Sequence, residues 1–489
     1  MAADQRRSRR SGGEDRISGL PDELLHDILV RLRCARAAAR TSVLSRRWRH
    51  VWAHLPELRL DQRRRPTASG LLFLDTIDAA LAGYSAPTLE RLSISIPSNS
   101  NAPSSVVGPG ARIAPWLHFA AARVVGELNL FLRAPQTFVV ATPEVVGEEA
   151  VLELPVCEQT KRIELFLQYA DTHWLRPQAS GSGLFTALTF LKVDGHVRMT
   201  GSDLTALVST QCPCLRELDL FITLIVNFHV LIHSNSLHTL VLRVLETRRL
   251  EVVAPRLEEL TVFARPLEAH ISATKLVKVA WHGVYDPHLH RFVDVGSTLR
   301  LLKTSSQALS LTKRFDEVDE LDHLSIDLKW QDVARYESFL NETNKLLKCK
   351  SLCISLLWEH ALVPVMWHLL RSCNGTKRLR VHLWGPWSQR VMHSCLPACP
   401  YRLEESLKID VIDLSSLEEV EISGFSGSHE QMELVEFLSS NARILKRLRI
   451  NYHNCRRPKE AREKVRSMCH PNLKVEFFVF HEGRQVLVE

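Results

Sequence analysis

A six-residue pattern of the form L-x-x-L-x-L recurs along the middle of this 489-residue chain. Its clearest copies are LRELDL, LHTLVL, LEELTV, LVKVAW, LRLLKT and LDHLSI. The middle apolar residues of these copies follow one another at steps of 22, 20, 19, 23 and 22, and they are Leu218, Leu240, Leu260, Val279, Leu302 and Leu324. Because one short copy cannot bury its own leucines, neighbouring copies must stack on each other.

The spacing falls within the window of roughly 20–29 residues that is typical of leucine-rich repeats. We expect each copy to give one short strand whose leucines point inward, with the intervening side chains on a concave outer face. Looser copies are LERLSI, VGELNL, LTFLKV, LEEVEI and LKRLRI. The asparagines of regular repeats are mostly missing, so the sequence predicts an irregular solenoid of α/β class.

The stretch DRISGLPDELLHDILVRL near the N-terminus predicts an amphipathic helix. Pro21 suits the first helical position, and Asp22 and Glu23 place negative charge at the positive end of the helix dipole. The spacing of the apolar residues puts them on one face; they are Leu20, Leu24, Leu25, Ile28, Leu29 and Leu32.

A second segment, ARAAARTSVLSRRWRHVWAHLPELRLD, begins with alanines that favour a helix. Ser45 is a candidate cap for a last short helix that carries Trp48, Val51 and Trp52. Three short helices in about 40 residues cannot bury all of these leucines and tryptophans by themselves. Part of this apolar surface should therefore contact another chain.

These segments closely resemble the plant F-box, which docks on the Skp adaptor of a cullin-based ubiquitin ligase. The resemblance rests on D-R-I-S-x-L-P-D-E-L-L-x-x-I-L, T-S-V-L-S-R-R-W-R-x-V-W and L-P-x-L-x-L-D. It implies a first docking helix with Leu20, Pro21, Leu24, Leu25, Ile28 and Leu32, and a second contact region with Val43, Leu44 and Trp48. Arg31 and Arg33 depart from the family, which often has an aromatic residue and a proline there, and this departure could weaken docking.

The segment LSSLEEVEISGFSGSHEQMELVEFLSSNARILKRLRI predicts a strand, a glycine turn, a helix and a second strand. Its V-E-I-x-G-F-x-G and N-A-x-x-L-K-R-L-x-I elements resemble the FBD domain that closes many plant F-box and leucine-rich-repeat proteins. The resemblance implies a cap for the repeats.

Composition narrows the function further. The formal charge of +7 is far from that of a dedicated nucleic-acid binder. The 11 cysteines contain no C-x-x-C pair, which argues against a structural zinc site, and the missing export signal predicts reduced thiols. The leader holds Arg6, Arg7, Arg9 and Arg10, either a nuclear-import patch or a solvated terminus. We expect a nuclear and/or cytoplasmic protein that has no membrane span, metal or cofactor.

No common catalytic motif is present, since GFSGS at Gly424 has its second glycine one position too early for a nucleophile turn. We therefore expect a non-catalytic binding protein. Four late tryptophans are either core residues or substrate anchors; they are Trp358, Trp367, Trp384 and Trp387. Arg380, His382, Arg447 and Arg449 either line a basic concave stripe or are solvated charges.

The sequence thus predicts a flexible basic leader over residues 1–15, a three-helix F-box over 16–60, an irregular leucine-rich-repeat region over 61–394 and an FBD-like region over 395–489. The favoured function is the substrate-recognition subunit of a ubiquitin ligase, which binds a Skp-type adaptor, through it a cullin scaffold, and an unidentified protein substrate. The alternatives are a scaffold that keeps the F-box fold outside a ligase, and a basic nucleic-acid-binding solenoid.

Overall fold

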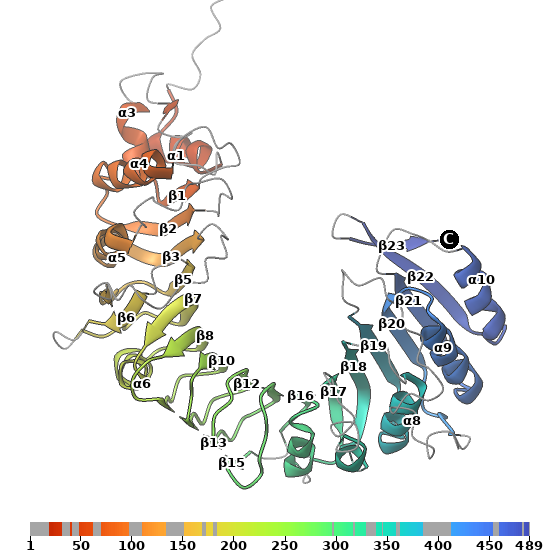
Figure 1. Cartoon of the computed structure of the whole chain (residues 1–489). Coiled ribbons are helices and arrows are strands. Elements are labelled where there is room, and N and C mark those ends of the chain that lie inside the picture. Colours follow the sequence, from red (N-terminus) through yellow and green to blue (C-terminus); the bar gives the residue numbers. More distant parts are fainter. Residues whose placement is uncertain are drawn as a thin grey trace, which may run out of the picture. The chain divides into compact units, whose positions relative to one another are not determined.

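The computed structural model forms two compact units, Met1–Arg198 and Met199–Glu489 (Figure 1). The division falls inside the predicted repeat region, and the two units are described separately. The structure describes residues 19–31, 40–41, 48–61, 70–96, 110–133, 151–168, 173–178, 183–295, 298–315, 318–328, 339–344, 346–357, 362–384, 412–452, 459–481 and 484–488.

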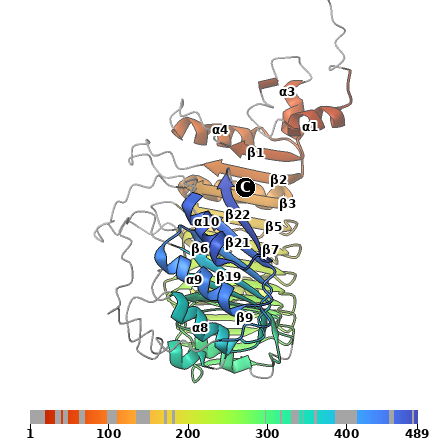
Figure 2. The same cartoon turned by 90° about the vertical axis from the view of Figure 1, so that its right-hand side faces the viewer.

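Short helices begin the first unit. They are α1 (Asp22–Arg31), α3 (Trp48–Val51) and the 3₁₀ turn η2 (Trp52–His54). The predicted amphipathic helix is thus present as α1. The predicted alanine-rich helix and Ser45 lie outside the described residues. Figure 2 shows α1 and α3 together beside the first strands of this unit.

Parallel strands form the body of the first unit. β1 (Glu57–Asp61) pairs with β2 (Leu89–Ile96), β2 with β3 (Val124–Arg133), β3 with β5 (Arg162–Gln168) and β5 with β7 (Phe190–Met199). Their Cα partners align one apolar ladder, which consists of Leu58, Leu92, Leu128, Ile163 and Leu191. The looser copies LERLSI, VGELNL and LTFLKV therefore occupy equivalent positions.

Two helices and two shorter strands complete this unit. The helix α4 (Gly70–Ala82) lies between β1 and β2 in the sequence, and α5 (Gly110–Arg123) lies between β2 and β3. The sequence analysis did not predict either helix. The short strands are β4 (Val151–Leu154) and β6 (His173–Pro177); β4 pairs with β6, and β6 pairs with the last part of β7.

A long parallel ladder runs through the second unit. Its strands, in the order in which they pair, are β8 (Glu217–Leu224), β10 (Thr239–Leu245), β12 (Glu259–Val262), β14 (Lys278–Trp281), β16 (Leu301–Ser305), β17 (Leu321–Leu328), β18 (Cys349–Leu356), β19 (Arg378–Leu383), β20 (Glu419–Phe425), β21 (Arg447–Tyr452) and β22 (Lys474–His481). The last strand, β23 (Arg484–Val488), pairs antiparallel with β22.

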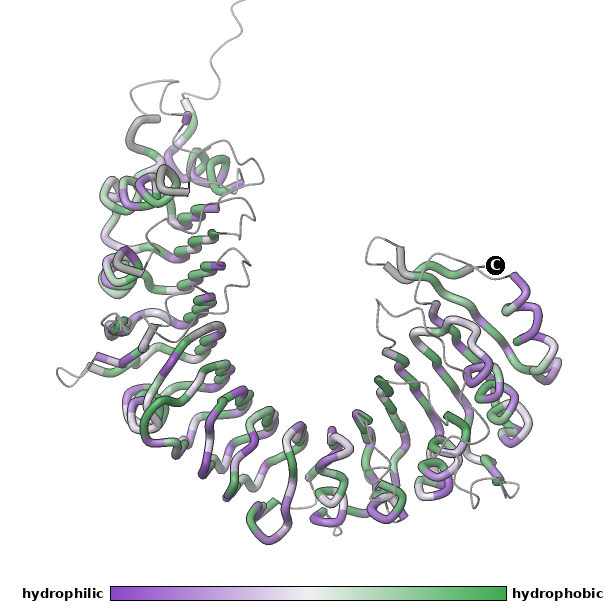
Figure 3. Tube along the Cα trace, in the orientation of Figure 1, coloured by the Kyte–Doolittle hydropathy of each residue, from purple (hydrophilic) through white to green (hydrophobic). Residues whose placement is uncertain are grey.

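The register of this ladder follows the predicted repeat. The six middle residues of the pattern are successive Cα partners from Leu218 on β8 to Leu324 on β17. The ladder then continues through Leu352, Leu379, Val420, Leu448 and Val475. All of the named residues from Leu218 to Leu448 are buried. Figure 3 shows the resulting alternation of apolar and polar residues along the strands.

Four repeats contain a second strand, which lies between the copies of the pattern and was not predicted. These strands are β9 (His229–His233), β11 (Arg249–Val253), β13 (Glu268–Ser272) and β15 (His290–Val293), and they form a separate parallel sheet. Buried and outward residues alternate along each of these strands. On β11 the buried residues are Leu250 and Val252. The buried residues of the two sheets share one core, in which Trp281 packs edge-on against Phe292 at 5.9 Å between ring centroids.

Helices complete the second unit. α6 (Gly201–Thr205) continues into η3 (Ala206–Gln211), and a 3₁₀ segment, η4 (Leu309–Phe315), follows β16. Later repeats contain α8 (Leu362–Ser372), α9 (His429–Asn441) and α10 (Lys459–Met468). Figure 1 shows these three helices on one side of the strands β18 to β22. Among the described residues, no helix is long and apolar enough to cross a membrane.

The turn before α9 has a buried polar anchor. Gln431 is fully buried, and its Oε1 accepts hydrogen bonds from Ser426 N at 2.8 Å, Ser426 Oγ at 3.3 Å and Gly427 N at 2.9 Å. Gly424 and Gly427 both have positive φ, which a side chain rarely allows. The predicted sequence of strand, glycine turn, helix and strand over this segment is confirmed as β20, α9 and β21.

Candidate functional site

The outer face of α1 presents an apolar pair. Leu24 is 47% exposed and Ile28 is 40% exposed, and residues four apart lie on the same face of a helix. Pro21, which precedes the helix, is also exposed. Exposed apolar side chains that adjoin each other on a short helix are the kind of surface that another protein covers.

A small core lies beneath this face. It consists of Leu25, Leu29, Trp48, Val51 and Leu55, each at most 6% exposed. Leu20, Val30 and Trp52 pack against it and are partly buried. The ring of His26 bridges the two parts, with its Nε2 at 3.2 Å from the carbonyl oxygen of Val51. This core fixes the orientation of α1, so Leu24 and Ile28 point away from the module.

The residues that were predicted to contact an adaptor differ in exposure. Leu24, Ile28 and Pro21 are exposed, and Leu20 is half-buried. Leu25 and Trp48 were expected to contact the partner, but both are buried in the core of the module itself, at 0% and 3% exposure. They therefore support the face from behind. Leu32, Val43 and Leu44 lie outside the described residues, as does Arg33, whereas Arg31 is exposed at the end of α1.

A buried tyrosine links this module to the first repeat. Tyr84 Oη lies within hydrogen-bond distance of two carbonyl oxygens, that of Leu55 at 2.8 Å and that of Thr88 at 2.9 Å, and its single proton is shared between them. Burial raises the pKa of Tyr84 to about 12. Ser85 N also donates to the carbonyl oxygen of Ala53 at 2.9 Å. The helix α1 thus rests on a module that is hydrogen-bonded to the segment leading into β2.

The predicted basic stripe of the second unit is largely paired with acids. Arg380 lies 3.5 Å from Glu421, Arg447 lies 3.3 Å from Glu419, and Arg449 lies 3.2 Å from Glu476, measured between side-chain nitrogen and oxygen. The glutamates come from β20 and β22, whose strands flank β21. The stripe is therefore a ladder of alternating charge, and it offers little net attraction for an acidic partner.

A more enclosed polar cluster lies on the same strand face. Asp327 Oδ2 is 3.3 Å from Lys303 Nζ and 3.6 Å from His282 Nδ1, although the Asp327 side chain is only 14% exposed. The His282 ring stacks on Phe263 with a centroid distance of 4.1 Å. His382 is near enough to Asp327 and Lys303 for their charges to act on it. Burial lowers the pKa of His382, while the nearby Glu421 carboxylate acts in the opposite direction.

The sequence contains a signal for this cluster that was not part of the prediction. His282, Ser305 and Asp327 each stand three positions after the middle residue of their repeat copy. The parallel register makes Ser305 and Asp327 Cα partners, and Ser305 Oγ donates a 3.5 Å hydrogen bond to the carbonyl oxygen of His282. Aligning the copies by their middle residues brings these three side chains together.

The late tryptophans were predicted to be either core residues or substrate anchors, and the two that the structure describes differ. Trp367 on α8 is half-buried, with the Arg371 guanidinium 5.1 Å from its ring. Trp384 follows β19 and is 59% exposed, as an anchor for a partner would be. Trp358 and Trp387 lie outside the described residues.

Within the described residues there is no cluster of histidine, cysteine and carboxylate groups that could hold a metal ion. The Cys157 and Cys212 thiols are also poor nucleophiles, because burial raises the pKa of each to about 12.

Two segments of the chain match models of known domain families. Residues 17–60 match the F-box domain, and residues 414–450 match FBD. The chain carries an F-box domain and an FBD domain. The exposed face of α1 belongs to the F-box, and the β20–α9–β21 segment coincides with the FBD match. The resemblance stated from the sequence is confirmed.

Several proteins of Arabidopsis thaliana that are named for an F-box are similar to parts of this chain. An F-box protein is 33% identical over 122 residues, which is 25% of this chain and 34% of the relative. An F-box/FBD/LRR-repeat protein is 36% identical over 143 residues, 28% of this chain and 30% of the relative. A third, named as an F-box/LRR-repeat protein, is 24% identical over 465 residues, 91% of this chain and 88% of the relative. The matches thus span about a third of the length of the first two relatives.

Proposed function

We propose that this chain is the substrate-recognition subunit of an SCF-type, cullin-based E3 ubiquitin ligase. The observation that carries the proposal is the exposed pair Leu24 and Ile28, which lies on a helix held over a closed core within the F-box match. This pair, with Pro21 and Leu20, would contact a Skp-type adaptor. Leu25 and Trp48 would hold the helix in place.

The repeats would form an irregular leucine-rich-repeat solenoid that ends in an FBD cap. Its register supports this reading, because equivalent leucines of successive copies are Cα partners. The outward strand face would hold a protein substrate, with the cluster of His282, Lys303 and Asp327 and the exposed Trp384 as candidate contacts.

In this proposal the chain has no catalytic step of its own. Holding a substrate lysine near a ubiquitin-loaded enzyme raises the effective concentration of one relative to the other. The rate of transfer therefore depends on binding at both surfaces. The chain would act in the nucleus and/or the cytoplasm, where the other ligase subunits must meet it, and imaging of a fluorescent fusion would test this.

The deciding experiment is capture of a purified Skp-type adaptor by the full chain, measured as an affinity. We expect Leu24→Asp or Ile28→Asp to weaken binding about 100-fold or more, because each would bury a charge in an apolar interface. Ile444→Asp is the matched control, since Ile444 is also 44% exposed but lies in the FBD match. Unchanged affinity in both α1 variants would reject the proposed docking face.

A scaffold outside a ligase is the second candidate, and the exposed Arg31 at the end of α1 favours it. It predicts no adaptor binding by the wild-type chain. A nucleic-acid-binding role instead predicts binding to an oligonucleotide that weakens steeply with salt. Adaptor binding by the wild-type chain would exclude the scaffold reading.

A further inference from the structure

Exposed apolar side chains concentrate in one part of the second unit. Of the 18 large apolar residues that are exposed in the described chain, eight lie between residues 221 and 293. All residues of that stretch are described. It contains β8 to β15, where the chain passes alternately between the two sheets. The passages from the long ladder to the second sheet, residues 225–228, 246–248, 263–267 and 282–289, form what we call the first edge. The return passages, of which residues 234–238, 254–258, 273–277, 294–295 and 298–300 are described, form the second edge.

The two edges differ in the exposed fraction of their apolar side chains. Each passage of the second edge has one leucine, and all four are 0% exposed: Leu237, Leu257, Leu276 and Leu299. The first edge and the residue just before it expose six apolar side chains by 44–63%: Val226, Leu245, Phe263, Leu267, Val284 and Leu289. Exposure is therefore not a general property of turns here. It belongs to one edge.

The backbone of the first edge is ordered by hydrogen bonds between successive passages. Leu267 N donates to the carbonyl oxygen of Arg248 at 2.9 Å, and Arg248 N donates to that of Phe228 at 2.8 Å. The Arg248 guanidinium also lies 5.2 Å from the Phe228 ring centroid. The exposed side chains are thus presented on a fixed frame, which lowers the entropy cost of binding.

Charged side chains of both signs surround the two leucines nearest the second sheet. Arg248, Arg249, Arg265 and Arg291 are exposed near Leu267 and Leu289, and the acids of the same passages and strands are Glu246, Glu251, Glu268 and Asp286. Glu251 already pairs with Arg249 at 3.3 Å and with His233 at 3.4 Å. Within the described residues, Arg265 and Arg291 make no ion pair. These two arginines are therefore available to the carboxylates of a partner.

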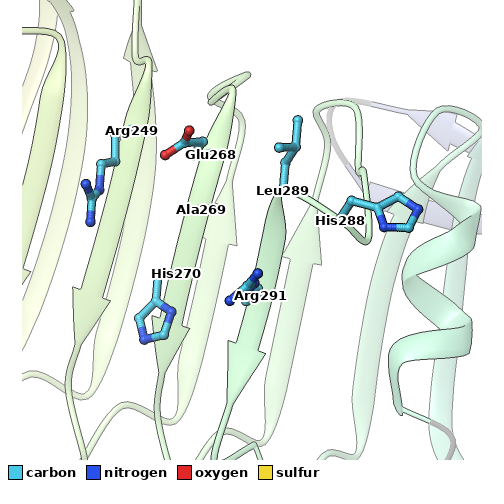
Figure 4. Close-up of a pocket in the computed structure, with 7 residues that line it drawn as sticks. All are labelled: Arg249, Glu268, Ala269, His270, His288, Leu289 and Arg291. Carbon is cyan, nitrogen blue, oxygen red and sulfur yellow. The ribbon is translucent and has the colours of Figure 1, made fainter.

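A hollow opens beside these leucines on the outer face of the second sheet (Figure 4). Its volume is about 300 Å³, at the low end for small-molecule sites, which suits one side chain better than a whole ligand. His270 and Arg291 are Cα partners on β13 and β15, and Figure 4 shows their side chains on the same part of the hollow. The lining residues are Arg249, Glu268, Ala269, His270, His288, Leu289 and Arg291.

We propose that this surface docks an acidic, amphipathic segment of a partner protein. Apolar side chains of the segment would cover Leu267 and Leu289, and one carboxylate would enter the hollow beside Arg291 and His270. None of Leu267, Leu289, His270 and Arg291 lies on α1 or on the outward strand face of the long ladder. The proposal therefore goes beyond the ligase function and does not depend on it.

Two other occupants fit the surface less well. A second copy of this chain, docked by the same surface, would bring Arg265 and Arg291 of both copies, which make no ion pair within the described residues, to one interface, and like charges repel. An anionic membrane would satisfy the arginines and leucines, but a flat bilayer surface would leave the hollow unused. A protein segment uses the leucines, the charges and the hollow together.

A random peptide-display library, selected on the full-length chain, tests the chemistry of the occupant directly. We expect enriched peptides to combine Asp or Glu with Leu or aromatic residues. The most enriched peptide, labelled with a fluorophore, should bind the chain in solution. The double variant Leu267→Ser/Leu289→Ser and the single variant Arg291→Ala should each weaken that binding at least tenfold.

Matched controls lie elsewhere in the unit. Ile444→Ser changes an apolar side chain of similar exposure, and Arg256→Ala removes an exposed arginine from the second edge. Both should leave peptide affinity unchanged, as should Leu24→Asp. Conversely, the double leucine variant should still capture the Skp-type adaptor, so failure of this proposal is distinguishable from failure of the ligase proposal.

Several results would overturn the inference. These are enrichment of basic or uncharged peptides, no enrichment at all, or equal binding by the double leucine variant. Binding to vesicles of anionic phospholipid without peptide binding would assign the surface to a membrane. Concentration-dependent dimerisation that the double leucine variant abolishes, again without peptide binding, would assign it to a second copy.

Discussion

The second unit contains two kinds of repeat that share one strand ladder. From Leu240 to Leu260 the step is 20 residues, and a strand of the second sheet backs the ladder. From Val420 to Leu448 the step is 28 residues, and α9 backs it. In both kinds the first layer is the same, a short parallel strand with inward leucines. The number of residues between one ladder strand and the next decides whether a strand or a helix forms the second layer.

Simple geometry explains the difference. The five residues of β11 span about 17 Å at roughly 3.3 Å per residue. The 11 residues of α8 span about 17 Å at roughly 1.5 Å per residue. A helix therefore covers the same length of core with six more residues. The step from Leu352 to Leu379, which contains α8, is seven residues longer than that from Leu240 to Leu260.

The largest expected effect concerns the core between the two sheets. Trp281 is fully buried there, close to Tyr285 and Phe292. Trp281→Ala should lower the free energy of unfolding by about 3–5 kcal/mol, because it leaves a large cavity. Urea denaturation followed by circular dichroism would measure it. The exposed Trp384 gives the control, and Trp384→Ala should change stability by about 0.5 kcal/mol or less. Equal effects would mean that the two-sheet core is not packed as described.

The helix-backed repeats depend more on buried polar groups. Gln431→Ala removes the acceptor for Ser426 N and Gly427 N. We expect a loss of about 1–3 kcal/mol, since these donors are left without their partner. Glu436→Ala, at an exposed position of the same helix, should be nearly neutral. Chemical denaturation of both variants is the measurement, and a neutral Gln431→Ala would show that the turn does not depend on this side chain.

A smaller effect is expected at the start of α9. Ser428 caps this helix, and its side chain accepts a hydrogen bond from Gln431 N at 3.4 Å. Ser428→Ala should cost about 1 kcal/mol, and Ser428→Gly less. The two-sheet repeats have strands in place of this helix and so lack such a site. Thermal unfolding of the two variants would test the ranking, which a more stable Ser428→Ala would reverse.

The last prediction concerns pH. His290 is 3% exposed in the two-sheet core, and burial is the main cause that lowers its pKa below the ordinary value of 6.5. The unfolded chain therefore takes up the proton first as pH falls, so stability is full above pH 6.5 and declines below it. His368 on α8 acts in the same direction. Urea midpoints measured from pH 7.5 to about 5 should fall less steeply in His290→Gln. An unchanged slope would assign the effect to other groups.

The strand register and the helix α1 were predictable because both leave a regular apolar spacing in the sequence. The second sheet was not predicted, because HVLIH and RLEVV are short and carry no leucine pattern. The amphipathic pattern of α1 could not show that Leu24 is exposed and Leu25 is buried. One of them is exposed and the other buried only because Trp48 and Leu55 close the core on one side.

The charge ladder shows a second limit. Arg380 and Arg449 were visible as outward strand residues, but their partners Glu421 and Glu476 come from neighbouring strands. The step from Leu379 to Val420 is 41 residues, far from the regular spacing, so the sequence did not show which residues would become neighbours.

The antiparallel strand β23 has a consequence for how the chain behaves at high concentration. A parallel ladder with an open edge is a template on which another copy can continue the same pairing. Here β23 turns back along β22, with Phe478 opposite Leu487 and Val479 opposite Val486. The next strand to arrive would meet a short neighbour running in the opposite direction, out of step with the repeat. The parallel pairing of the ladder therefore stops at β22, and a further strand could join only beside a strand of opposite direction.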